Sequence, residues 1–123
     1  MKKIIIDTNI LMAISELSLD VFTAINDFCD FAYSLHVLEG TIKELEKIKE
    51  EQRGKFKMAA LLALQLLKAK NVKTIPSIGH VDDILVEYST KGYLIITQDV
   101  LLKKRLHKPY LTIRQKKMVV MVN

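Results

Sequence analysis

Short apolar segments of the strand type alternate with helical patterns along the whole chain. Strand-like runs lie at residues 4–6, 33–38, 72–75, 93–97 and 111–113, each followed by a polar, capping or turn-forming residue. Apolar residues recur at helical spacing between these runs, at residues 10–14, 21–28, 41–48, 55–70 and 81–92. This alternation is typical of a parallel sheet covered by helices on both faces. We therefore predict a three-layer α/β/α sandwich with a central parallel five-stranded sheet and an extra C-terminal edge strand at residues 118–122.

The length of the chain sets the expected scale of the fold. A chain of 123 residues, half of them apolar, is expected to form a single domain, residues 1–123, with a real core.

The only cysteine, Cys29, cannot form an internal disulfide, and the N-terminus runs into a strand pattern without the shape of a signal peptide. The longest apolar stretch, residues 58–67, is about half a membrane span. We expect a cytoplasmic protein with no membrane segment.

Four carboxylates occupy positions that an α/β fold brings together. Asp7 and Asp99 follow predicted strands, and Glu44 and Asp83 lie near the starts of predicted helices. In an open α/β sheet, ligands gather outside the carboxyl ends of the strands. Clustered carboxylates repel one another unless a cation neutralises them, and a hard cation such as Mg²⁺ or Mn²⁺ prefers oxygen ligands. The pattern indicates metal-assisted chemistry on phosphate.

Each acid also has a purely structural interpretation. Asp7 and Asp99 are good helix N-cap residues, and Thr41-x-x-Glu44 has the form of a capping box. Asp82 and Asp83 occupy a first helical turn, where the helix dipole favours anions. On the helical wheel Asp82 flanks the apolar stripe and Asp83 lies nearly opposite it. Periodicity alone leaves open which of these two adjacent acids turns inward.

Taken together, the motifs resemble those of the PIN domain nucleases. The resemblance rests on Asp7-Thr8-Asn9-Ile10-Leu11 after the first strand, Glu44-Leu45, Asp83-Ile84-Leu85-Val86, and Thr97-Gln98-Asp99 followed by Leu101. The motifs are collinear over residues 3–106. The resemblance implies an α/β/α sandwich, an acidic pocket that holds Mg²⁺ or Mn²⁺, and endonucleolytic cleavage of single-stranded or structured RNA.

The same resemblance assigns expected roles to individual residues. Asp7, Glu44, Asp83 and Asp99 match the catalytic and metal-binding acids of the family, and Asp82 is an additional candidate ligand. Asn9 and Thr97 match smaller polar positions that orient a ligand or a water. Gln98 departs from the shorter polar residue usual before the last aspartate, which affects the shape of the pocket rather than its chemistry. The doublet Asp82-Asp83 and the final strand look more like the archaeal and eukaryotic ribosomal-RNA-processing branch than the VapC-type toxins.

Other catalytic arrangements fit the sequence less well. His36, His80 and His107 have no zinc-ligand spacing with Cys29 or with one another. Neither G-x-x-x-x-G-K-[ST] nor G-x-G-x-x-G occurs. A receiver domain needs an acid pair after the first strand, and a haloacid-type phosphatase needs Asp-x-Asp where this chain has Asp7-Thr8-Asn9.

The distribution of charge favours RNA as the partner. The formal net charge is +5, and no acidic residue follows Asp99. The C-terminal segment instead carries seven cations, which we expect to include phosphate contacts. They are Lys103, Lys104, Arg105, Lys108, Arg114, Lys116 and Lys117.

Two further interpretations of the function remain open at this point. The chain could be a VapC-type toxin ribonuclease held inactive by an antitoxin that occupies the acidic pocket. It could also be a non-catalytic RNA-binding module that works with a ribosome-assembly partner, although four retained acids argue against this. So small a domain offers little surface to grip RNA, and a homodimer is therefore expected.

Overall fold

The computed structural model describes residues 1–123 and contains one six-stranded sheet in the order β3-β2-β1-β4-β5-β6. Strands β1 to β5 pair in parallel, and β6 pairs antiparallel to β5. The predicted parallel five-stranded sheet and its extra C-terminal edge strand are confirmed. The strands are β1 (Lys2–Ile6), β2 (Tyr33–Leu38), β3 (Lys73–Ile75), β4 (Leu94–Ile96), β5 (Tyr110–Arg114) and β6 (Met118–Val122).

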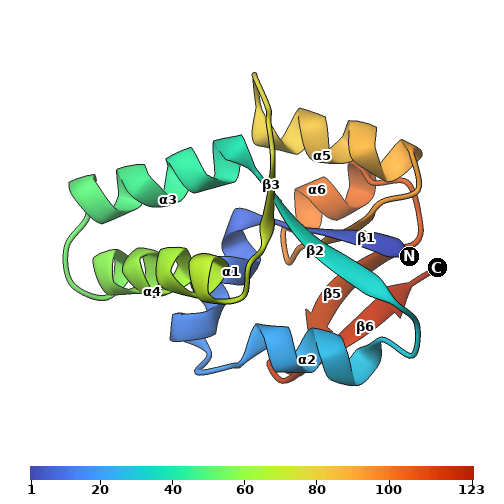
Figure 1. Cartoon of the computed structure of the whole chain (residues 1–123), viewed down its shortest axis with the longest axis horizontal. Coiled ribbons are helices and arrows are strands. Elements are labelled where there is room, and N and C mark those ends of the chain that lie inside the picture. Colours follow the sequence, from blue (N-terminus) through green and yellow to red (C-terminus); the bar gives the residue numbers. More distant parts are fainter.

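Helices cover both faces of this sheet, as the sequence predicted. Helices α5 and α6 lie together on one face, while α3 and α4 form a hairpin that extends beyond the sheet (Figure 1). Each face of the sheet has its own cluster of apolar side chains between the strands and the helices. The molecule therefore has three layers. The helices are α1 (Thr8–Glu16), α2 (Val21–Phe28), α3 (Glu39–Glu51), α4 (Lys55–Ala69), α5 (Val81–Thr90) and α6 (Val100–Arg105).

The central strand β1 shows how the sequence specifies this layering. Ile4, Ile5 and Ile6 are completely buried, because side chains alternate between the two covered faces of the sheet. Ile4 and Ile6 belong to the larger cluster, which α1, α2, α3 and α4 complete. Ile5 belongs to the smaller cluster, together with Leu85 of α5 and Leu102 of α6. The short β-branched run therefore joins both halves of the core.

Helix α3 begins earlier than the sequence predicted. It starts at Glu39, its N-cap position is Leu38, and no side chain caps it. Thr41 lies inside the first turn, with its side chain fully buried and its hydroxyl unpartnered. The capping-box interpretation of Thr41 and Glu44 is therefore wrong, because strand β2 passes directly into the helix and leaves Thr41 no N-cap position. Asp99 does cap α6, as predicted, and Asp20 caps α2.

Gly40 allows the starts of α3 and α5 to approach each other closely. A Cβ atom at Gly40 would lie 2.8 Å from Cγ2 of Val81, the first residue of α5. The backbone N–H of Gly40 also donates a 2.9 Å hydrogen bond to Ser77, in the loop before α5. These contacts place the first turns of the two helices that carry Glu44 and Asp82 side by side.

No single helix is long and apolar enough to cross a membrane. Taken together, helices α1 and α2 have the length and composition of a membrane span, but the chain bends by 113° between them. Ile10, Leu11 and Ile25 of that pair are completely buried in the core.

Candidate acidic active site

Asp7 is the most buried acid of the candidate site. It follows β1 directly, and its side chain accepts a 2.8 Å hydrogen bond from the backbone N–H of Thr8. Only 5% of the residue is exposed. Burial raises the pKa of Asp7 from its usual 3.8 to about 6, although hydrogen bonds from Thr97 and Thr8 oppose the shift. The charges of Asp82 and Glu44 raise it further, so both acids lie near Asp7.

The hydroxyl of Thr97 connects three of the predicted site residues. It donates a 2.7 Å hydrogen bond to Oδ2 of Asp7 and accepts one of 3.0 Å from the backbone N–H of Asp99. The Nδ2 group of Asn9 also donates to it, at 3.4 Å, and Oδ1 of Asn9 accepts a 3.2 Å bond from the backbone N–H of Gln98. Because Ile6 pairs with Ile96 in the sheet, the ends of β1 and β4 are held in register beneath this network.

Glu44 and Asp82 bring negative charge to the same place from two other helices. Glu44 reaches solvent, but enough of its carboxylate is surrounded by protein that burial raises its pKa. The nearby Thr8 hydroxyl opposes this rise, and the negative charge of Asp82 adds to it. Asp82 is exposed in the first turn of α5. The structure therefore brings together Asp7, Glu44 and Asp82.

Asp83 faces a different partner. Its Oδ1 atom accepts a 2.6 Å hydrogen bond from the terminal nitrogen of Arg105, at the end of α6. This bond, with the positive charge of Arg105, holds the pKa of the Asp83 carboxyl below its usual value. Of the two adjacent acids, Asp82 acts on the pKa values of Asp7 and Glu44, while Asp83 forms an ion pair with Arg105.

Asp99 lies at the edge of this group and is tied to it through Thr97. Its Oδ1 atom accepts hydrogen bonds of 2.9 and 3.0 Å from the backbone N–H groups of Leu101 and Leu102. The capping interpretation is therefore confirmed for Asp99. Its carboxylate has a second oxygen, so this cap leaves Oδ2 available for another partner.

Three of the acids, Glu44, Asp82 and Asp83, line an open cleft of about 520 Å³ together with His80, Val81 and Arg105. Asp7 is buried nearby and is not part of the cleft lining. A larger cleft of about 600 Å³ runs along the start of β2 and contains no acid, so it does not compete as a metal site. The donor chemistry of the cleft and of the adjacent Asp7 fits a hard cation, because the carboxylates and the buried, unpartnered Thr8 hydroxyl beside Asp7 all offer oxygen atoms. No three His, Cys, Asp or Glu side chains are arranged to ligate one ion in this conformation.

Comparison with known proteins identifies the fold and family. A family model described as "PIN like domain" matches residues 4–116. The chain belongs to the PIN-like domain family. Ribonuclease VapC9 of Archaeoglobus fulgidus is 36% identical over 103 residues, which cover 82% of this PIN-like chain and 73% of the relative. The solved structure of the PIN domain endonuclease Utp24 superposes with a TM-score of 0.74 at 20% identity, covering 97% of this chain and 90% of the other.

The predicted RNA-binding cations of this PIN-like chain do not form one surface. Arg105 lines the acidic cleft, beside Lys103 and Lys104 in the last turn of α6. Because β5 is parallel to β1, Arg114 at its end lies on the same edge of the sheet as Asp7, whereas Lys108 precedes β5 and lies on the opposite edge. Lys116 and Lys117 are exposed in the turn after Arg114.

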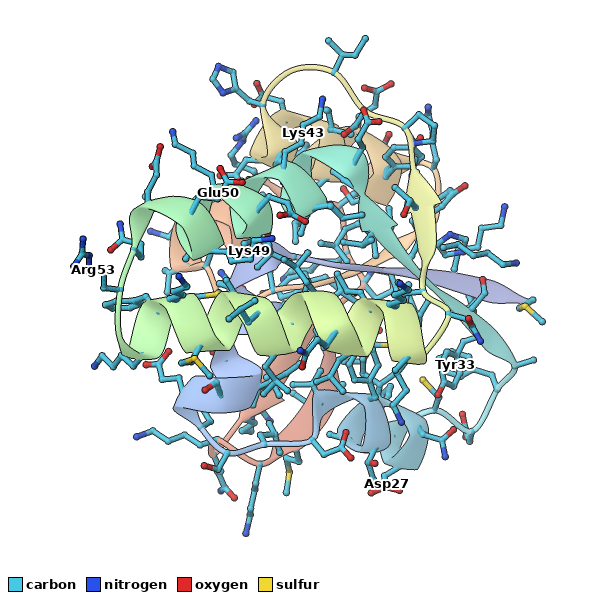
Figure 2. The ribbon with its side chains drawn as sticks, turned by 60° about the vertical axis from the view of Figure 1, so that its left-hand side comes forward. Asp27, Tyr33, Lys43, Lys49, Glu50 and Arg53 are labelled. Atoms are coloured by element: carbon cyan, nitrogen blue, oxygen red, sulfur yellow. The ribbon has the colours of Figure 1, made fainter.

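Charges on α3, by contrast, are mixed. Figure 2 shows Lys43, Lys49 and Glu50 along this helix and Arg53 at the turn towards α4. Lys43 pairs with Glu39 at 3.8 Å, and Lys49 pairs with Glu46 at 2.7 Å. Cations on this helix are therefore partly neutralised by their neighbours, unlike those after Asp99.

Three features of this PIN-like site were not predicted from the sequence. They are the buried Thr8 hydroxyl near Glu44, the close approach at Gly40, and the pairing of Asp83 with Arg105. The first two depend on contacts between distant segments and leave no local signal. The third had a partial signal, because the helical wheel already placed Asp83 opposite the apolar stripe of α5.

Proposed function

We propose that this chain is a divalent-metal-dependent endoribonuclease that hydrolyses RNA phosphodiester bonds. The observation that carries the proposal is the buried carboxylate of Asp7, with a pKa raised to about 6, next to the like charges of Glu44 and Asp82. An arrangement of this kind is unfavourable without a cation, and perturbed acids of this kind cluster at functional sites. Membership of the PIN-like family and the ribonuclease name of the VapC9 relative support the same activity.

The metal would be Mg²⁺ or Mn²⁺, held by Asp7, Asp82, Glu44 and Asp99. Such an ion lowers the pKa of a bound water and neutralises charge on the phosphate in the transition state. Glu44 and Asp82 are exposed side chains, so both can turn towards an ion near Asp7. Asp83, the other candidate from the sequence, has its carboxylate engaged by Arg105.

The remaining site residues have supporting roles in this proposal. Thr97 fixes the orientation of the Asp7 carboxylate, and Asn9 holds Thr97 and the backbone of Gln98 in place. The raised pKa of Glu44 makes its carboxylate a stronger base than an ordinary glutamate, which suits a group that takes a proton from water. Lys103, Lys104, Arg105 and Arg114 bind RNA phosphates, and Lys108, on the opposite edge, would contact a more distant part of a long RNA.

A circular single-stranded RNA tests both the chemistry and its endonucleolytic character, because a circle has no ends for an exonuclease. We expect linear products with Mn²⁺ or Mg²⁺, and none when EDTA replaces the metal. A circular DNA of the same sequence tests the preference for RNA. If a panel of RNAs is bound but never cleaved with either metal, the chain is a non-catalytic RNA-binding module instead.

The VapC9 relative favours a second, more specific role. Its identity of 36% supports a toxin ribonuclease whose activity an antitoxin blocks. The ribosomal-RNA-processing role draws its support from the Utp24 likeness, which at 20% identity is a likeness of fold. A small DNA-binding protein encoded next to this chain that co-purifies with it and stops cleavage would establish the toxin role; stable co-purification with ribosomal precursors would favour processing.

We also propose that the active form is a homodimer. The small acidic cleft leaves little surface to hold RNA, and α4 exposes the apolar side chains of Phe56, Met58 and Leu62. Burial of these side chains against a second copy would favour association. Light scattering during gel filtration is expected to give twice the chain mass of 14.1 kDa, and a Met58→Glu variant is expected to elute as a monomer.

A further inference from the structure

The ion pair between Asp83 and Arg105 lies across the mouth of the acidic cleft. The cleft is lined by α3 through Glu44, by α5 through Asp82 and Asp83, and by α6 through Arg105. Arg105 is the only Lys or Arg side chain among the six lining residues. Its guanidinium is therefore the fixed positive charge of the cleft lining.

The pair contributes little to folding, because both partners are exposed. The side chains of Arg105 and Asp83 are 48% and 61% exposed, and ion pairs of this kind stabilise proteins only weakly. Its main consequence is geometric. One terminal nitrogen of Arg105 is bound to Oδ1 of Asp83 at 2.6 Å, which orients the planar guanidinium and leaves other N–H donors free.

Among the side chains that line the cleft, Arg105 is the only Lys or Arg that an RNA phosphate can meet beside Glu44 and Asp82. A guanidinium matches the geometry of a phosphate group and binds it through parallel N–H···O bonds. We propose that Asp83 is a positioning residue that holds Arg105 at the mouth of the cleft, where Arg105 binds a phosphate of the RNA chain beside the bond to be cleaved. This inference rests on the proposed ribonuclease function and divides the acid doublet between two tasks. Asp82 faces the reaction centre, and Asp83 orients the substrate-binding arginine.

Comparison of Asp83→Asn with Asp83→Ala isolates the positioning role. Both variants remove the same negative charge, but Asn keeps an oxygen that accepts the hydrogen bond from Arg105. Binding of a fluorescein-labelled single-stranded RNA of mixed sequence is measured in Ca²⁺, which should fill the cleft without supporting cleavage. We expect Arg105→Ala to weaken binding about tenfold and to lower the salt slope by roughly one unit. Asp83→Ala should bind RNA at least about threefold more weakly than Asp83→Asn. This difference should vanish in the Arg105→Ala background.

The pair formed by Glu87 and Lys91 on the same helix α5 provides a matched control. These side chains are 64% and 55% exposed and lie 3.4 Å apart, outside the cleft. Glu87→Ala and Lys91→Ala should leave RNA binding unchanged. All variants should unfold at nearly the parent temperature.

Steady-state cleavage with Mn²⁺ adds an independent readout. Arg105→Ala and Asp83→Ala are expected to raise KM more than they lower kcat, whereas Asp82→Asn should lower kcat. The inference is overturned if Asp83→Asn lowers kcat as much as Asp82→Asn, because Asp83 would then serve the reaction centre. It is also overturned if the Ala and Asn variants bind RNA equally with Arg105 present. If the parent protein cleaves no RNA, the proposed function fails, and the binding measurements still decide the role of the pair.

Discussion

The hydroxyl of Thr97 donates a 2.7 Å hydrogen bond to the carboxylate of Asp7, across 90 residues of sequence. Both side chains are buried at the carboxyl ends of the neighbouring strands β1 and β4. The bond lowers the pKa of Asp7 and so opposes the larger effect of burial. It keeps the most buried acid of the site in one orientation.

Replacement of Thr97 tests this arrangement. Thr97→Val keeps the shape of the side chain but leaves Asp7 Oδ2 and the backbone N–H of Asp99 without their partner. We expect a loss of about 2 kcal/mol in the free energy of unfolding and weaker Mn²⁺ binding. Thr97→Ser retains the hydroxyl and should lose less of both. Urea unfolding and calorimetric titration with Mn²⁺ measure the two effects, and equal behaviour of the Val and Ser variants would contradict a role for the hydroxyl.

Asp7 should make the metal-free protein less stable as the pH rises. Its pKa is about 6 in the folded protein and is expected to return to 3.8 on unfolding, so the folded state binds the extra proton between these values. The contribution is favourable below about pH 4 and is lost as the pH rises through about 6. Without metal, Asp7→Asn should therefore become more stable than the parent across this interval, by up to about 3 kcal/mol at pH 7. Saturating Mn²⁺ should reduce the difference, because the metal stabilises only the parent carboxylate. Urea unfolding of both proteins from pH 4 to pH 8 measures this, and a difference that does not vary with pH would contradict the account.

Thr41 and Glu44 should now behave independently of each other. Because the Thr41 hydroxyl is buried without a partner, Thr41→Val is expected to leave stability unchanged or raise it by about 1 kcal/mol. Glu44→Gln should lose most cleavage activity without loss of stability, since it removes repulsion from Asp82. Glu50→Gln, an exposed acid on the same helix, is the control for activity (Figure 2). Unimpaired cleavage by Glu44→Gln would remove Glu44 from the site.

If the C-terminal cations contact RNA phosphates, the affinity for RNA should fall as the salt concentration rises. Each phosphate contact that is removed should reduce the slope of log affinity against log salt by roughly one unit. A Lys103/Lys104→Ala double variant should show this reduction in Ca²⁺, whereas Lys55/Lys57→Ala, at the start of α4, should not. An unchanged slope in the first variant would mean that RNA approaches from another face.

The alternation of strands and helices was enough to predict the sheet, its five parallel strands and the extra C-terminal edge strand, whose antiparallel direction only the structure shows. A continuous apolar run indicates a strand that is covered on both faces, and Ile4, Ile5 and Ile6 are all completely buried. Asp7 and Thr97 were also placed at the carboxyl ends of predicted parallel strands, but only the structure shows that these two strands are neighbours. Local sequence patterns were therefore enough to predict the helices and strands and the part of the site that lies at the ends of the strands.

The division between Asp82 and Asp83 could not be predicted in the same way. Adjacent residues on a helix point about 100° apart, and which one faces the cleft depends on how the helix sits on the sheet. Here that depends on Gly40, whose missing Cβ lets α5 approach α3. The capping box predicted at Thr41 was wrong for a similar reason. Strand β2 passes directly into α3, and the packing of both elements sets where the helix begins.

The most direct test of the central claim is the rate at which Asp7→Asn cleaves a circular single-stranded RNA across a Mn²⁺ titration. Asp20→Asn is the matched control, because Asp20 is also a helix N-cap aspartate but caps α2 and lines a different pocket, with Leu66 and Lys70. We predict cleavage by the parent and by Asp20→Asn that saturates with Mn²⁺, and none by Asp7→Asn at any concentration. Substantial cleavage by folded Asp7→Asn in excess Mn²⁺ would contradict the assignment of this site.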